Sequence, residues 1–295
     1  MLDSSNIQSV VITGASSGIG RATALLLAQA QYRVFAGVRT TQAAEALLSV
    51  CPSTTLIPVN LDVTREDQIR AAVALISETL GPAGGLAALI NNAGIVLCSP
   101  LETCPIALIR DQFEVNLIGQ LAVTQAFLPL IRKCQGRIIN IGSISGRFSP
   151  PYLGAYAATK HAIEAMTDAL RRELLPEGIR VCLIEPGAIE TAVWNKSEDT
   201  YRSGLGAELF GGPGSHYTAA LRAIQHLSAR LRAKATRPEV VAKLITRIIQ
   251  TPSPKSRYLL GLDAKAQAWM EQWVPVRWAD RLIESVLVRA GGGGS

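Results

Sequence analysis

The sequence TGASSGIG, which runs from Thr13 to Gly20, is the strongest indication of how this chain folds. It follows a short apolar run at residues 10–12 and precedes an Ala- and Leu-rich stretch at residues 22–30, so its glycines lie at a strand-to-helix turn. Glycines at such a turn let the backbone approach a pyrophosphate, which rests on the amino end of the helix. The spacing alone is weak evidence, but this context favours a dinucleotide site over an ordinary tight turn. The residues expected to line the site are Gly14, Ser16, Ser17, Gly18, Ile19 and Gly20.

Short apolar runs alternate with longer helical patterns along most of the chain. The apolar runs lie at residues 10–12, 33–38, 56–61, 86–90, 137–141, 180–184 and 257–260. Helical patterns such as residues 66–80 and 162–175 separate them. Continuous apolar strands connected by helices predict a parallel sheet that is covered on both faces. The sequence therefore predicts the α/β class: one Rossmann-type, doubly wound domain over residues 1–290, with a mostly seven-stranded sheet.

The alternation fails at residues 191–237, a stretch rich in glycine with a basic helical pattern at residues 219–235. Long insertions in compact folds are often functional, so we interpret this stretch as a helical substrate lid. A helix then begins at Arg237-Pro238, where proline suits the first turn. Residues 263–290 form a C-terminal extension, in which Trp269, Trp273 and Trp278 recur at roughly helical spacing; this favours core or subunit interface over membrane surface. The final GGGGS, residues 291–295, is interpreted as an artificial flexible linker.

Composition narrows the class of protein. Apolar residues make up 48% of the chain and aromatic residues only 5%, which suits an aliphatic core and argues against disorder. The five cysteines are an odd number without ligand spacing, so reduced thiols and a cytoplasmic location are expected. The three histidines do not pair at ligand spacing, and no metal site is predicted. The net charge of +6 is scattered, which does not indicate nucleic-acid binding, and neither a signal peptide nor a membrane-spanning apolar run is expected.

The residue after the second strand bears on the choice of cofactor. The apolar run at residues 33–38 ends at Arg39. In dinucleotide-binding folds an acidic residue near this point binds the ribose 2′-hydroxyl, whereas an arginine accommodates a 2′-phosphate through charge-assisted hydrogen bonds. Arg39 therefore predicts NADP(H) rather than NAD(H); the alternative is an ordinary surface charge.

Tyr156 and Lys160 are the candidate proton-transfer pair. Their spacing of four puts both side chains on one face of a helix. A free tyrosine has a pKa of about 10, and a neighbouring ammonium would stabilise the phenolate and lower that pKa. Ser143 follows the strand at residues 137–141, at the edge of the sheet where a hydroxyl can orient a substrate. Each feature alone is common, but their order behind the glycine-rich turn predicts acid–base chemistry on a carbonyl or alcohol.

Together these motifs resemble the short-chain dehydrogenase/reductase family over roughly residues 10–191. The motifs that carry the resemblance are the stretch 13–20, Asn91-Asn92-Ala93-Gly94, Asn116, Ser143, Tyr156, Lys160 and Pro186-Gly187. The resemblance implies that Tyr156 is the acid and base, that Ser143 polarises the carbonyl, and that Lys160 binds the nicotinamide ribose. It also implies that Asn116 holds a water in a proton relay. The remaining cofactor contacts that it implies are Asp62 and Val63 at the adenine, Pro186, Gly187, Ile189 and Thr191 at the nicotinamide, and Asn91, Ala93 and Gly94, which would also support the central strand.

Stretches 170–181 and 184–187 are similar to the retinol dehydrogenase and 17-beta-hydroxysteroid dehydrogenase branch of that family. This likeness implies a bulky lipophilic carbonyl or alcohol, retinoid- or steroid-like, as the small-molecule substrate, and a homodimer or homotetramer. Candidate substrate contacts follow from position and could equally be packing residues: Ser143, Ser145, Phe148, Tyr152, Val193 and Trp194. The alternatives are a non-catalytic protein that senses NADP(H), a reductase of small aldehydes or ketones, a sugar-nucleotide epimerase or dehydratase, and a scaffolding protein. The glycine spacing disfavours the epimerase, and the complete set of proton-transfer residues disfavours the sensor and the scaffold.

Overall fold

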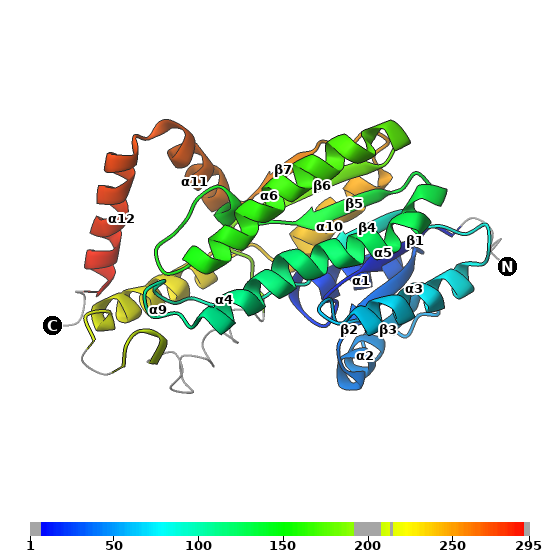
Figure 1. The fold of residues 1–295 in the computed structure, drawn as a ribbon, viewed down its shortest axis with the longest axis horizontal. Coiled ribbons are helices and arrows are strands. Elements are labelled where there is room, and N and C mark those ends of the chain that lie inside the picture. The colour runs from blue at the N-terminus through cyan, green and yellow to red at the C-terminus, as the bar shows by residue number, and fades with distance from the viewer. Residues whose placement is uncertain (1–6, 192–207, 213–214, 292–295) are drawn as a thin grey trace.

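A parallel seven-stranded sheet lies at the centre of the computed structural model, which describes residues 7–191, 208–212 and 215–291 (Figure 1). The strand order is β3-β2-β1-β4-β5-β6-β7. The strands are β1 (Ser9–Ile12), β2 (Arg33–Val38), β3 (Leu56–Asn60), β4 (Ala88–Asn91), β5 (Arg137–Ile141), β6 (Arg180–Pro186) and β7 (Arg257–Leu260). Each coincides with a predicted apolar run, so the doubly wound α/β fold is confirmed.

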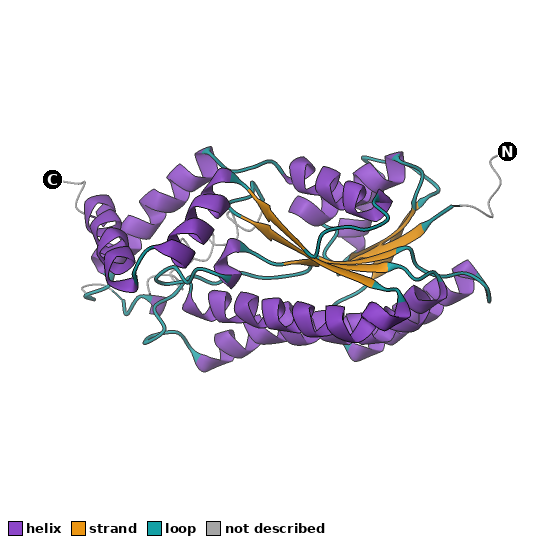
Figure 2. Ribbon diagram, turned by 90° about the horizontal axis from the view of Figure 1, so that it is seen from above, coloured by secondary structure: helices purple, strands orange, loops and turns teal. Residues whose placement is uncertain are grey.

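Helices cover both faces of the sheet (Figure 2). Residues of α1 (Gly18–Gln29), α2 (Thr41–Leu48) and α10 (Pro238–Gln250) share one hydrophobic core with the strands. Residues of α3 (Glu66–Leu80), α5 (Gly119–Lys133) and α6 (Gly154–Leu174) share the core on the other face. The strands are buried on both sides, which explains why their sequences are continuous apolar runs without polar alternation. Two short 3₁₀ turns, η3 (Ile144–Gly146) and η4 (Leu175–Glu177), flank α6.

One long helical run lies among these helices. It consists of α4 (Ile106–Phe113), a π-turn η2 (Glu114–Ile118) and α5. By length and composition this run, Ile106–Lys133, could cross a membrane. Its apolar residues Val123, Phe127 and Ile131 are instead fully buried against the sheet, as in the core helix of a globular domain.

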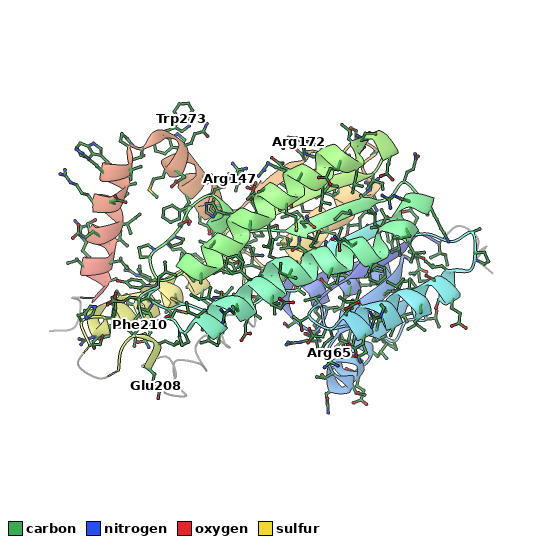
Figure 3. All side chains as sticks on the ribbon, viewed as in Figure 1. Arg65, Arg147, Arg172, Glu208, Phe210 and Trp273 are labelled. Carbon is green, nitrogen blue, oxygen red and sulfur yellow. The ribbon has the colours of Figure 1, made fainter. Side chains whose placement is uncertain are left out.

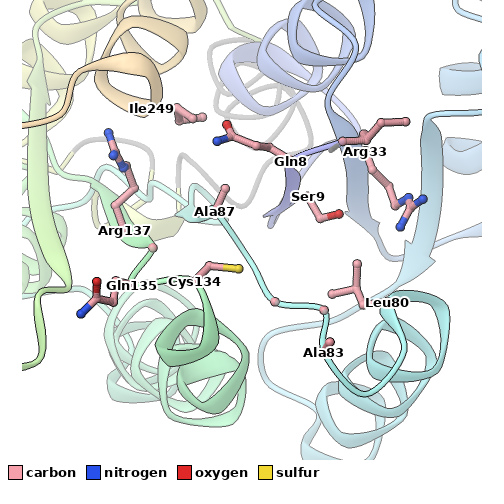
Figure 4. Close-up of a pocket in the computed structure, with 14 residues that line it drawn as sticks. Gln8, Ser9, Arg33, Leu80, Ala83, Ala87, Cys134, Gln135, Arg137 and Ile249 are labelled. Carbon is pink, nitrogen blue, oxygen red and sulfur yellow. The ribbon is translucent and has the colours of Figure 1, made fainter. Parts of the chain in front are cut away.

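The strand order reverses between β1 and β4, because β1 pairs with β2 on one side and with β4 on the other. Ligands of doubly wound sheets bind at such a switch point, beyond the carboxyl ends of the strands. A cavity of about 480 Å³ opens at the opposite edge, among residues at the amino ends of the strands such as Ser9, Arg33 and Arg137 (Figure 4). That cavity is remote from the switch point and does not belong to the candidate site.

The predicted lid leaves and rejoins the domain at one place. Ile189 forms a parallel bridge with Thr236, so the two ends of the segment lie side by side. Its basic helical pattern forms α9 (Thr218–Ala233), which contacts the terminal helix α12 (Val276–Gly291). Much of the segment, including Val193 and Trp194, lies outside the described residues.

The C-terminal helices α11 (Leu262–Trp273) and α12 extend away from the sheet (Figures 1 and 3). Trp269, Trp273 and Trp278 are 62–65% exposed, so the core interpretation of these residues is wrong for the single chain. Because α11 and α12 lie beyond the sheet, these tryptophans do not pack into the core of the sheet. The expectation that they form an interface between subunits stays a prediction. Residues 292–295 of the GGGGS sequence lie outside the described residues.

Candidate active site

The glycine-rich turn after β1 is tight, as the sequence predicts. Gly14 and Gly18 have φ values of +66° and +54°, in the left-handed region that side chains disfavour. A Cβ on Gly20 would lie only 2.2 Å from the carbonyl oxygen of Gly14. The backbone N–H of Ala15 donates to the carbonyl of Gly37 at 2.8 Å, which fixes the turn against β2. The result is a narrow backbone cradle at the amino end of α1.

The first turn of α1 suits an anion. Ser17 is its N-cap residue, and the Ser17 hydroxyl does not cap the helix. The first turn, which the structure describes in full, also has no acidic residue. Its leading amide groups therefore remain available to a ligand, and the positive end of the helix dipole favours negative charge there. Ser16 is exposed beside this cradle, and Ile19 is partly buried on the helix.

Two residues that the sequence analysis did not assign hold the turn in place. The Thr13 hydroxyl oxygen accepts from the backbone N–H groups of Asn92 and Ala93, each at 3.0 Å. The Asn92 amide donates to the carbonyls of Thr13 and Gly14, at 2.9 and 3.1 Å. These bonds join the turn after β1 to the turn after β4. Asn92 stands in the quoted motif, and that motif was the available signal.

The side chain of Asn91 supports the central strands, which is one of the two roles that the resemblance implies. Its side chain is 2% exposed and donates to Thr124 on α5, at 2.8 Å, and to Asn140 on β5, at 3.0 Å. Asn140 in turn donates to Thr167 on α6 at 2.8 Å. Successive side chains of a strand point to opposite faces, and Asn91 points into the layer between the sheet and its helices. Asn91 therefore supports the central strands from within.

Ala93 and Gly94 follow at the carboxyl end of β4, near the turn. Ala93 is bound through its backbone to Thr13, at 3.0 Å. Gly94 lies against the side chain of Asn116, since a Cβ on Gly94 would be 3.2 Å from the Asn116 Oδ1 atom. Both residues thus shape the floor of the predicted site through the backbone.

Arg39 and Asp62 follow neighbouring strands, as predicted for the adenosine end of the cofactor. β2 and β3 pair in parallel to their ends, at Val38 and Asn60. Arg39 is exposed directly after β2. One oxygen of the Asp62 carboxylate accepts from the backbone and hydroxyl of Thr64, at 3.0 and 2.8 Å, and this fixes the turn after β3. Val63 is only 6% exposed, so little of its surface can contact an adenine ring.

The predicted nicotinamide segment begins where β6 ends at Pro186. Gly187 has no room for a side chain, because a Cβ would lie 2.2 Å from the carboxylate of Asp263. That carboxylate accepts from the backbone N–H of Ala188 at 2.7 Å, a contact that the sequence analysis missed. Thr191 reaches the glycine-rich turn, because its Cγ2 atom would lie 2.9 Å from a Cβ on Gly18. The turns after β1 and β6 thus face each other, while Ile189 is buried.

Ser143, Tyr156 and Lys160 come together at the carboxyl end of β5. The Tyr156 phenol lies close enough to Ser143 for a side-chain hydrogen bond between them to affect its pKa. The Lys160 ammonium donates to the carbonyl of Ile141 at 2.9 Å and lies 5.7 Å from the centre of the Tyr156 ring. Ser143 is 8% exposed and Lys160 is 6% exposed. Ser143 and Lys160 are therefore shielded from water, while Tyr156 is partly exposed beside them.

Burial is the main influence on the pKa values of this pair. Burial raises the pKa of the Tyr156 phenol, and the hydrogen bond with Ser143 opposes that rise. Burial also lowers the pKa of Lys160 to about 8. In both groups the loss of water disfavours the charged form, which is the phenolate of Tyr156 and the ammonium of Lys160.

Asn116 lies in the π-turn η2 and is fully buried. Its amide oxygen accepts from the backbone N–H of Ile95 at 2.8 Å, and its nitrogen donates to the Ile95 carbonyl at 2.9 Å and the Thr159 hydroxyl at 3.1 Å. The side chain therefore joins the segment after β4 to α6. These bonds engage both the oxygen and the nitrogen of the Asn116 amide. The water of the proton relay that the resemblance implies would therefore bind the main chain of Asn116. π-turns are often found at functional sites.

The candidate substrate residues fall into two groups. Ser145 is buried, and its backbone N–H donates to the Ser143 hydroxyl at 3.1 Å, which indicates support of Ser143. Tyr152 has a φ of +67° and packs against Phe210 and Tyr217, with ring centres 5.7 and 6.2 Å apart. Phe148, which lies between Ser145 and Tyr152 in the sequence, is partly buried. An aromatic wall thus joins the approach to α6 with the lid segment; Figure 3 marks Phe210.

Comparison with known proteins gives a consistent result. A family model described as short chain dehydrogenase matches residues 8–202. The chain is 34% identical to an NADPH-dependent 3-dehydrocapnine reductase of Ornithobacterium rhinotracheale, covering 92% of this chain and 95% of the relative. It is 35% identical to 17-beta-hydroxysteroid dehydrogenase type 6 of Bos taurus, with 93% and 87% covered. It is 32% identical to retinol dehydrogenase 5 of Mus musculus, with 95% and 89% covered.

Solved structures agree on the fold. A short-chain dehydrogenase from Streptomyces avermitilis superposes with a TM-score of 0.75 at 26% identity, covering 98% of this chain and 99% of that chain. ElxO with NADP bound superposes with a TM-score of 0.68 at 25% identity, covering 86% and 96%.

Proposed function

Since the chain belongs to the short-chain dehydrogenase/reductase family, we propose that it interconverts a carbonyl and an alcohol, with Tyr156 as the acid and base. The observation that carries this proposal is the closeness of the Tyr156 and Ser143 hydroxyl groups, with Lys160 over the ring of Tyr156. Two hydroxyl groups within reach of each other can both bind a single substrate oxygen. Such a pair, next to a dinucleotide cradle, fits hydride transfer with a coupled proton transfer.

The chemistry of the chain's own residues follows from this geometry. The bound nicotinamide supplies or accepts the hydride. Ser143 holds the substrate oxygen through a hydrogen bond, and in reduction Tyr156 gives that oxygen its phenolic proton. Burial raises the pKa of Tyr156, so the phenol of this site is protonated at neutral pH and holds the proton that reduction would consume.

The cofactor is NADP(H). The glycine turn fits a pyrophosphate, since the start of α1 packs on the turn too closely for a side chain at Gly20 and presents the amino end of the helix. Arg39, exposed after β2, suits a 2′-phosphate. A relative named for NADPH dependence and the NADP-bound structure of ElxO support the same choice. The residues that would hold it are those of the turns after β1, β2, β4 and β6.

We propose a lipophilic substrate, retinoid- or steroid-like. The names of the hydroxysteroid and retinol dehydrogenase relatives support this. A reductase of smaller carbonyl compounds is the second candidate, which the likeness to the 3-dehydrocapnine reductase favours. A protein that only senses NADP(H) is the third, and the site gives it no support because Ser143, Tyr156 and Lys160 are all in place.

We also propose a homodimer or homotetramer that works in the cytoplasm. The exposed Trp269, Trp273 and Trp278 support an interface between copies, because a wide apolar surface of this kind is usually covered. Light scattering after size-exclusion chromatography measures the assembly directly. Sedimentation with liposomes tests the alternative that these residues bind a membrane surface.

The experiment that tests the proposed reaction is NADPH oxidation by the purified chain with retinoids, steroids and small carbonyl compounds. Tyr156→Phe should lower kcat by about 10²- to 10⁴-fold, because the phenyl ring cannot supply a proton. The dissociation constant for NADPH should stay nearly constant. Tyr258→Phe is the matched control, since the Tyr258 hydroxyl accepts from the backbone of Lys255 beside β7. Full turnover in Tyr156→Phe would refute the role of Tyr156.

A further inference from the structure

A buried carboxylate that the proposed chemistry does not use lies at the end of β6. Glu185 is 0% exposed and directly precedes Pro186 and Gly187. Both of its oxygens bind Arg147, through the Nε atom and, at 2.9 Å, through the Nη2 atom. A two-bond pair of this kind fixes direction as well as distance. Glu185 is therefore held rigidly, close to the segment predicted to hold the nicotinamide.

Arg147 connects this carboxylate to Ser143. It follows η3, and its backbone N–H donates to the Ile144 carbonyl at 2.9 Å. Gly146 donates in the same way to the Ser143 carbonyl at 2.9 Å. Backbone hydrogen bonds thus hold the turn from Ser143 to Arg147 together, and the Arg147 side chain at its end binds Glu185. Figure 3 marks Arg147 close to α6.

Arg257 connects the same carboxylate to the catalytic helix. Its Nη1 atom lies 3.6 Å from the Glu185 Oε1 atom and also binds Glu164. Its Nη2 atom lies 3.2 Å from the carboxylate of Asp168. Glu164 and Asp168 follow Lys160 at intervals of about one helical turn on α6. Arg257 therefore forms ion pairs along the side of the helix that also carries Lys160.

The two halves of this network also touch each other. A Cβ on Gly146 would lie 3.0 Å from Glu164 and 3.0 Å from the Lys160 carbonyl, so the serine turn packs closely on α6. Buried ion pairs contribute little net stability, because taking the charges out of water costs about as much as their attraction returns. A role in positioning the serine turn relative to α6 accounts better for the carboxylate of Glu185, which Arg147 and Arg257 share.

We propose that Glu185 is a positioning residue that sets the separation of the Ser143 and Tyr156 hydroxyl groups, through Arg147 on one side and Arg257 on the other. This inference rests on the proposed function, because it concerns the oxygen atoms that bind the substrate. Misplacement of a reacting group by about 1 Å can cost on the order of 10²-fold in rate. Loss of the shared carboxylate should therefore lower kcat and leave the cofactor cradle intact.

The first test is Glu185→Gln in the full chain. We expect kcat to fall about 10- to 100-fold while KM for NADPH changes by less than about twofold. The matched control is Glu177→Gln, which breaks the exposed Arg132–Glu177 pair and should leave kcat unchanged. If Glu185→Gln does not fold, Arg147→Gln makes the same test, since the Arg147 side chain is 37% exposed. Arg147→Lys should recover part of the lost rate. Full activity in both glutamine variants would overturn the inference.

The second test asks whether Glu185 acts through Ser143. In a Ser143→Ala background, Glu185→Gln should reduce kcat by much less than it does in the wild type, because residues acting as one unit are not additive. If the double variant loses kcat by the product of the two single losses, Glu185 does not act through Ser143.

Absorbance titration of the phenolate needs no turnover: loss of the Ser143 contact should raise the pKa of Tyr156 further in Glu185→Gln. A wild-type chain without turnover on any substrate would instead refute the proposed function, and the titration would still decide the role of Glu185.

Discussion

The substitution Gly20→Ala tests the cofactor cradle most directly. A Cβ at this position would lie 2.2 Å from the Gly14 carbonyl oxygen and 2.5 Å from the Asn92 amide nitrogen. Real Cβ contacts stay beyond 3.0 Å, so the backbone of the turn must move by about 0.8 Å. The Asn92 side chain cannot simply rotate away, because it donates to the carbonyls of Thr13 and Gly14. The strain therefore falls on the part of the turn that would hold the pyrophosphate.

The expected loss follows from the size of this overlap. Forcing one extra methyl group into a well-packed site costs about 1–3 kcal/mol. If the turn is strained when NADPH binds, the dissociation constant for NADPH rises about 5- to 150-fold. If the turn is also strained in the folded chain without NADPH, the free energy of unfolding falls by a similar amount. Quenching of tryptophan fluorescence by NADPH measures the dissociation constant, and urea unfolding measures the stability.

Gly81→Ala is the matched control for this experiment. Gly81 also has a positive φ, +71°, but no atom lies within 4 Å of its Cβ position, and it ends α3 at the opposite edge of the sheet. It should lose about 1 kcal/mol of stability from the strained backbone and bind NADPH as the wild type does. A folded Gly20→Ala chain with an unchanged dissociation constant would refute the assignment of the turn.

Three further outcomes follow from the structure. Arg39→Asp should shift the preference from NADPH toward NADH, because a carboxylate repels the 2′-phosphate; unchanged kinetic ratios for the two cofactors would sink the assignment. Turnover in the reductive direction should decline as pH rises through about 8, because buried Lys160 then loses its charge. Lys160→Arg should abolish this decline at high pH. A decline that persists in the arginine variant would show that another group causes it. Asn91→Leu should lower the free energy of unfolding by about 1–3 kcal/mol without weakening NADPH binding, since it leaves the buried Oδ1 atom of Asn140 without its donor; a large loss of affinity would show that Asn91 also serves the cofactor site.

The fold was predictable because its signals are local. Each strand is buried on both faces, so each appears as a continuous apolar run, and all of the predicted runs became strands of the sheet. The glycine turn and the Tyr156–Lys160 spacing are local as well, since they depend on backbone conformation within a few residues. The C-terminal tryptophans were harder to interpret, because helical spacing alone does not say whether the face it creates is covered.

The sequence by itself determined the doubly wound sheet, the phosphate turn and the pair of side chains for proton transfer, because each depends on periodicity or on short spacing. Only the tertiary structure decided which asparagine supports the turn, Asn92 rather than Asn91, because that depends on the face toward which each side chain points at the strand end. It also decided that burial, and not Lys160, dominates the pKa of Tyr156. The ion pairs of Glu185 join residues 38 or more positions apart, and contacts at such separations exist only once the strands have paired.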